Sequence, residues 1–199
     1  PGLDQYHSTE TFLTEALTLE AKSEIDKALN AEMPFFLHMS HYAVHSPFQS
    51  DPRFAANYAE SSKHERYKAY ATMIEGMDKS LGDLMDHLEA RGVAANTLIL
   101  FLGDNGGDAP VQNVDAIDAS APLRGRKGGK WEGGMRVPFI ASWGKADARN
   151  SRQQTFPIPA GSVRQEIGAC YDLFPTILDF ANALTPSDHP VDGQNLLSL

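Results

Sequence analysis

The sequence lacks the features that would assign it to a membrane, to a disulfide-rich class or to nucleic-acid binding. None of its apolar runs approaches the ~20 residues needed to cross a bilayer, and the first residues contain no apolar signal-peptide core. Its single cysteine, Cys170, excludes an internal disulfide and a multi-thiolate metal site. The net charge of −9 argues against nucleic acid as a partner, since phosphate binding needs a basic surface.

The remaining composition is that of an ordinary globular domain. The 199 residues are 42% hydrophobic and 22% charged, enough for one domain with a sizeable core. A local basic cluster can still bind an anionic small substrate within an acidic chain.

Helical periodicity of the apolar residues predicts three helices. The clearest of the three, at residues 64–91, has apolar side chains every three or four residues on one face. The first is expected to have Thr9 as its N-cap, and the last Asp172. The predicted ranges are 10–30, 64–91 and 172–184.

Short apolar runs predict three strands, over residues 34–40, 97–102 and 136–143. The run at 97–102 is bounded by a glycine-rich turn and predicts a fully buried strand. Pro138 predicts that the last strand lies near an edge of the sheet, or that the proline lies at the start of the strand or at a bulge. The order strand, helix, strand implies a right-handed βαβ crossover. We therefore expect an α/β fold with a mixed, mostly parallel sheet flanked by helices.

Polar side chains follow directly after the strand at 97–102. Asp104 and Asn105 stand in the run GDNGG, and both offer oxygen ligands, which Ca²⁺ and Mg²⁺ prefer. In open α/β sheets, ligands bind beyond the carboxyl ends of the strands. Asp, Asn and Gly also make ordinary turns, so this segment alone favours a metal site and a turn equally.

Two further loops carry candidate functional side chains. His45 lies in HYAVHSP, where a structural role is the stronger interpretation of the histidine by itself. Lys127 lies in PLRGRKGGKWEGG, which is either an anion-binding loop or a solvated turn. Cys170 is interpreted as a small buried apolar residue.

Taken in order, the segments FFLHMSHYAVHSP, GDNGG and PLRGRKGGKWEGGMRVP resemble the sulfatase family, within the alkaline-phosphatase-like superfamily of metal-dependent hydrolases. The tail YDLFPTILDFANAL followed by VDGQNLL is similar to the family's later helix and Asp-Gly turn. The resemblance covers residues 6–197 and implies that residues 1–199 are part of a sulfatase catalytic domain.

The resemblance implies roles for four residues. Asp104 and Asn105 match the pair that ligates the divalent cation, usually calcium, with Mg²⁺ as an alternative. His45 matches the histidine that reaches the sulfate or its leaving oxygen, and Lys127 matches the lysine that contacts a sulfate oxygen. An imidazole and an ammonium aimed at those oxygens would stabilise charge in the transition state.

The chain also departs from the family pattern. Val44 replaces a proline before His45, and Tyr42 stands where His or Asn is common. The Cys-x-Pro-x-Arg motif that yields the formylglycine nucleophile does not occur, nor does the earlier Asp-Asp metal pair. Residues 120–124, SAPLR, match the serine form of the motif by letter, but they lie at the start of the cationic loop, which resembles a later segment of the family. We expect these parts and a smaller C-terminal subdomain to lie outside this chain. The fragment alone should then be inactive, bind metal weakly and self-associate through unpaired strand edges.

The implied activity is hydrolysis of a sulfate ester of a small molecule or glycan. The alternatives are a phosphonate or phosphate monoesterase of the same superfamily, and a non-catalytic module that kept the fold. The family resemblance suggests a periplasmic or secreted location.

Overall fold

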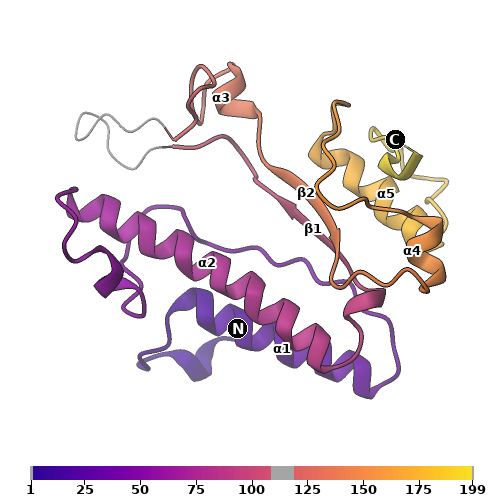
Figure 1. Ribbon diagram of the computed structural model, residues 1–199, viewed down its shortest axis with the longest axis horizontal. Helices are drawn as coiled ribbons and strands as arrows, with labels where there is room; N and C mark the ends of the chain where they lie inside the picture. The colour runs from indigo at the N-terminus through magenta and orange to yellow at the C-terminus, as the bar shows by residue number, and fades with distance from the viewer. Residues whose placement is uncertain (1, 109–118, 199) are drawn as a thin grey trace.

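The computed structural model describes residues 2–108 and 119–198 (Figure 1). Helices α1 and α2 lie side by side, and a ribbon of two strands separates them from α4 and α5 in this view. Helix α3 lies at the end of the ribbon that points away from α4. The elements are α1 (Leu13–Asn30), α2 (Glu65–Ala90), β1 (Leu98–Leu102), α3 (Glu132–Met135), β2 (Phe139–Trp143), α4 (Ser151–Thr155) and α5 (Leu173–Phe180).

The two long helices confirm the prediction from periodicity. Helix α2 starts and ends within one residue of the predicted range, and Ile25 of α1 packs against Leu88 of α2 in a shared core. The predicted N-cap of α1 is wrong. Thr9 accepts a hydrogen bond from Thr11 N at 3.2 Å and donates to Tyr6 O at 2.8 Å, so it closes a turn before the helix. Phe12 occupies the N-cap position instead.

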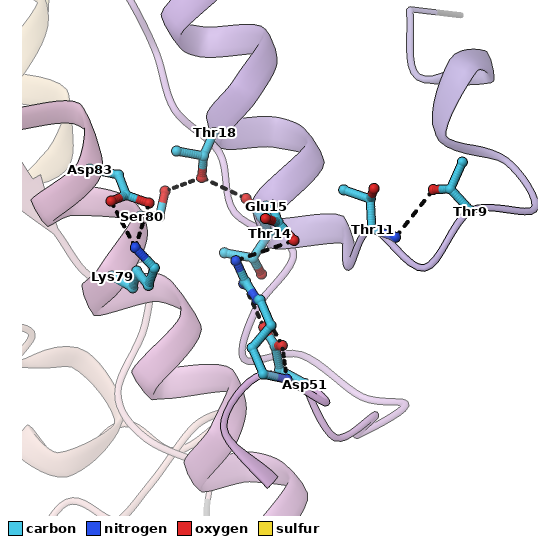
Figure 2. A network of polar contacts seen from close by, with 10 residues as sticks. Thr9, Thr11, Thr14, Glu15, Thr18, Asp51, Lys79, Ser80 and Asp83 are labelled. Atoms are coloured by element: carbon cyan, nitrogen blue, oxygen red, sulfur yellow. Dashed lines mark hydrogen bonds and ion pairs between the residues drawn. The ribbon is translucent and has the colours of Figure 1, made fainter. Parts of the chain in front are cut away.

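Polar contacts also join α1 to α2 and to the loop before α2 (Figure 2). The hydroxyl of Thr18 lies 2.6 Å from that of Ser80. Asp51 is fully buried, and its carboxylate accepts hydrogen bonds from Arg53 N at 3.1 Å, Nε at 3.0 Å and a terminal guanidinium nitrogen at 2.7 Å. Arg53 also lies 3.4 Å from Glu15 of α1. Asp51 N donates to Thr72 Oγ1 of α2 at 2.9 Å, so the loop is fixed against both helices.

Strands β1 and β2 pair antiparallel, with Leu98 opposite Trp143 and Leu102 opposite Phe139. Gly103 N donates to Pro138 O at 3.1 Å, and β2 begins at the next residue, Phe139. Pro138 therefore lies next to the start of the strand, which was one of the three positions predicted for it. The predicted full burial of β1 is wrong, because every residue of the strand keeps intermediate exposure. Its Ile99 packs on the core shared by α1 and α2.

Among the described residues, neither the predicted strand at 34–40 nor the βαβ crossover is found. Within the described residues this segment forms no ladder, Phe36 is 73% exposed, and the sheet consists of β1 and β2 alone. Pro34 has no N–H to donate, and no described strand lies beside the segment to accept its other hydrogen bonds. The mostly parallel sheet therefore stays a prediction, while the mixture of helix and sheet is confirmed.

The C-terminal part packs through aromatic rings and one buried carboxylate. The ring of Phe180 lies 5.6 Å from that of Trp143 and 5.5 Å from that of Phe156. Asp172 makes no side-chain cap on α5; it accepts hydrogen bonds from Ala169 N and Gln194 N, both at 2.7 Å. This bonds the tail to the start of α5.

Helix α5 ends at Phe180, before the predicted residue 184, because Asn182 adopts a left-handed conformation with φ 54°. Across the described ranges, no helix has the length and apolar character that a membrane span requires.

Candidate functional site

The GDNGG turn after β1 is held against residues 119–134 by close backbone contacts. Gly106 N donates to Gly134 O at 3.0 Å, and a Cβ added to Gly106 would lie 1.9 Å from Gly133 O. Only glycine allows this approach. Lys127 N donates to Gly107 O at 3.1 Å. The structure therefore brings the Lys127 loop to the segment that carries Asp104 and Asn105.

Asp104 and Asn105 present oxygen atoms suited to a hard cation. One carboxylate oxygen of Asp104 accepts from Asn105 N at 2.9 Å, and its other oxygen takes no hydrogen bond from a described residue. The Asn105 amide nitrogen donates to Gly106 O at 2.9 Å, which leaves its Oδ1 as an acceptor. Such oxygens fit Ca²⁺ or Mg²⁺. No group of three or more His, Cys, Asp or Glu able to hold a metal occurs among the described residues.

An open pocket of about 350 Å³ lies beside Asn105. Arg136 also lines the pocket and forms an ion pair of 3.4 Å with Glu132, in which both side chains are about two-thirds exposed. Such a pair is screened by water and leaves the guanidinium free to meet an anion. The other lining residues are Gly106, Gly107, Ala119, Ser120, Leu123, Val137 and Pro138.

Ser120 and Arg136 were missed by sequence reasoning. Ser120 Oγ lies 2.8 Å from Gly133 O and 3.4 Å from Gly107 O, and it can donate to either. The serine thus helps to hold the GDNGG turn against the segment around Gly133. A serine in a loop carries no signal of such a contact. Arg136 is the second residue after the EGG run, and its position close to the cationic loop in the sequence was the available signal.

His45 is oriented by its own loop. Its Nδ1 lies 2.8 Å from Ser46 O, and a carbonyl oxygen only accepts, so Nδ1 carries the hydrogen of this bond and donates it. Tyr42 donates to the same Ser46 O at 2.6 Å, and its ring lies 5.5 Å from the imidazole.

The four predicted site residues thus fall into two groups. Asp104, Asn105 and Lys127 are joined through the backbone, as described above. Within the described part of the chain, no hydrogen bond or ion pair links His45 to any of them. The prediction that all four form one site is therefore only partly reflected in these contacts.

Comparison with known proteins identifies the family to which this chain belongs. The sulfatase family model matches residues 3–183, and the chain belongs to the sulfatase family. It is 32% identical to steryl-sulfatase of Homo sapiens over 195 residues, which cover 94% of this chain and 29% of that protein. It is also 32% identical to N-acetylgalactosamine-6-sulfatase of Canis lupus familiaris, with 94% of this chain and 32% of that protein covered.

A solved structure shows the same fold. The crystal structure of Ps i-CgsB in complex with k-i-k-neocarrahexaose has a TM-score of 0.79 and 32% identity, covering 94% of this chain and 38% of that one. The chain therefore spans about a third of the length of the curated relatives that it matches.

Proposed function

We propose that this chain is part of the catalytic domain of an enzyme that hydrolyses sulfate esters. The observation that supports the proposal is the hydrogen bond from Lys127 N to Gly107 O, which joins the loop that carries Lys127 to the turn that carries Asp104 and Asn105. A sulfate ester is an anion, and such a site pairs a cationic donor with a cation-binding turn. Membership of the sulfatase family supports the same reaction class.

Each residue has a definite task in this proposal. Asp104 and Asn105 would hold a divalent cation, most simply Ca²⁺, which supplies Lewis acidity and a fixed template when bound. The Lys127 ammonium binds a sulfate oxygen as a compact point charge. His45, with Nδ1 held by Ser46 O, gives or takes a proton at Nε2 on the side of the leaving oxygen.

The nucleophile is expected to come from elsewhere. These 199 residues contain no Cys-x-Pro-x-Arg motif, and their Ser-x-Pro-x-Arg match, at residues 120–124, opens the cationic loop, where Ser120 Oγ donates to Gly133 O. We therefore expect a formylglycine supplied from outside this chain. With two oxygen ligands of the 6–8 that calcium typically takes, this chain would provide only part of the metal shell. The fragment alone is expected to be inactive.

The relatives suggest the kind of substrate. Their names concern a steryl sulfate and an N-acetylgalactosamine 6-sulfate, and the solved structure contains a neocarrahexaose. We propose a sulfated sugar or a small sulfate ester as the substrate of this enzyme. A mostly parallel sheet completed by the rest of the domain belongs to the same proposal.

The test is the activity of the complete enzyme toward 4-nitrophenyl sulfate. Lys127→Ala should lower kcat/KM about 100-fold or more, because one preorganised donor is typically worth about 3 kcal/mol in the transition state. Lys63→Ala removes the same charge from an exposed position before α2 and should change little. Equal rates for the wild type and Lys127→Ala would contradict the role of this lysine.

A calorimetric titration with Ca²⁺ tests the metal. The wild-type enzyme should bind the ion, and Asp104→Ala should weaken binding at least tenfold because it removes a carboxylate ligand. Hydrolysis of a phosphate or phosphonate monoester in place of every sulfate ester in a substrate panel would favour the related hydrolase class instead.

A further inference from the structure

An arginine in the cationic loop is stacked on an exposed tryptophan. The guanidinium carbon of Arg124 lies 3.6 Å from the ring centroid of Trp131, and Trp131 is 43% exposed. A guanidinium stacked on an aromatic face keeps its N–H groups in its own plane, where they can meet an anion. The stacking therefore fixes the position of the charge without occupying its donors.

The donors of this pair have no partner in the part of the chain that the structure describes. No carboxylate or carbonyl accepts from the Arg124 side chain there, and the same holds for the indole N–H of Trp131. Nearby Arg126, Lys127 and Lys130 also form no ion pair with a described residue. In a chain with 26 acidic and 17 basic side chains, a run of unpaired cations is a strong local exception.

The loop that carries these groups is held by its own backbone. Gly133 N donates to Arg124 O at 2.8 Å. Gly125 adopts φ 87°, and a Cβ there would lie 2.8 Å from that of Trp131, so the chain folds tightly onto the indole. The stacked pair is thus built on a fixed turn rather than on a freely moving side chain.

We propose that Arg124 and Trp131 form a second anion subsite, which binds another sulfate group of a polysulfated oligosaccharide while Lys127 binds the scissile one. The inference rests on the proposed function for the role of Lys127. Two residues lie between Arg124 and Lys127, so their Cα atoms are three residue steps apart and at most about 11 Å from each other. One oligosaccharide can therefore reach both. The indole edge adds an N–H donor and an apolar surface for the sugar ring.

Calorimetry on the complete protein tests the subsite with two probes, sucrose octasulfate and glucose 6-sulfate. The wild type should bind sucrose octasulfate at least about tenfold more tightly than glucose 6-sulfate, because Arg124 adds a charge-assisted bidentate contact. Arg124→Gln should weaken that binding about tenfold, and Arg124→Lys should weaken it less, since the charge remains without the planar fork. The effect should shrink as salt rises.

The matched control is Arg164→Gln, which removes the same charge from an exposed arginine that also has no ion pair among the described residues. It should change the dissociation constant less than twofold, as an exposed charge remote from the ligand does. Equal losses in Arg124→Gln and Arg164→Gln would refute the subsite, as would equal affinity of the wild type for both probes. Arg124 is exposed, so its variants are expected to fold, and the thermal midpoint of each is checked.

Sulfate release is measured in the same samples. Selective binding without release from any probe would support the subsite and count against the hydrolase. Release of sulfate, together with unchanged binding in Arg124→Gln, would support the hydrolase and refute the subsite. The two proposals therefore fail separately.

Discussion

Two glycines in the interior of helix α2 should respond oppositely to the same substitution. A Cβ added to Gly76 would lie 2.9 Å from Asp51 Oδ2, whereas a Cβ added to Gly82 meets no atom within 4 Å. Glycine in a helix interior costs about 0.5–1 kcal/mol relative to alanine, so Gly82→Ala should stabilise the protein by that amount. At Gly76 the same gain in propensity is opposed by the contact with the carboxylate.

The carboxylate of Asp51 has little freedom to move away. Asp51 is fully buried, and its two oxygens are bonded to Arg53 at 3.1, 3.0 and 2.7 Å. Overpacking a well-filled site typically costs about 1–3 kcal/mol, and disturbing a buried ion pair adds to that cost. We therefore expect Gly76→Ala to lower the free energy of unfolding by about 1 kcal/mol or more after the gain in propensity is counted.

Urea unfolding, followed by circular dichroism at 222 nm, measures both variants against the wild type. The midpoint should rise for Gly82→Ala and fall for Gly76→Ala, with similar slopes. A midpoint for Gly76→Ala as high as that of Gly82→Ala would show that the Asp51 site yields at no cost, and would refute the reasoning.

Two further predictions concern buried polar groups. Asp172→Ala should destabilise the protein by about 2–4 kcal/mol, because it leaves the N–H groups of Ala169 and Gln194 without their acceptor. Limited proteolysis should then cut the tail faster in this variant than in Asp188→Ala, a control at an exposed position. Burial lowers the pKa of His41 below 6.5, and its Nδ1 has no hydrogen-bond partner among the described groups. As the pH falls below 6.5, the unfolded chain therefore takes up this proton more readily and the free energy of unfolding falls. Urea midpoints between about pH 7 and pH 5.5 should fall less steeply in His41→Gln than in the wild type, while His189→Gln, at an exposed site, should follow the wild type.

Sequence periodicity was sufficient for the elements whose packing is one-sided and local. Helix α2 shows its buried face in its own sequence, so its ends were predicted to within one residue. The run at 34–40 is as apolar as a strand, but a strand also needs a partner, and the identity of a partner is not a local property. The cap at Thr9 failed for a related reason, because its hydroxyl bonds a nearer turn.

The candidate site shows the same division. The residue types at Asp104, Asn105 and Lys127 could be read from the sequence, as could their order. Their proximity depends on close backbone contacts of Gly106 and Gly107 with a segment up to 28 residues further along the chain, since Gly106 bonds Gly134. No periodicity marks such contacts. The stacking of Arg124 on Trp131 likewise appears only once the loop has folded on Gly125.

The two halves of the site are therefore stabilised by different means. The turn after β1 and the Lys127 loop are joined by backbone groups, so the side chains of Asp104 and Lys127 are exposed and contribute little to that joining. The loop that carries His45 is closed by side chains, since Tyr42 and His45 both donate to Ser46 O. Substituting Asp104 or Lys127 should thus change the chemistry while leaving the local fold intact, whereas substituting Tyr42 should alter the orientation of His45. Loss of activity in the first case reports on catalysis, and in the second case on positioning.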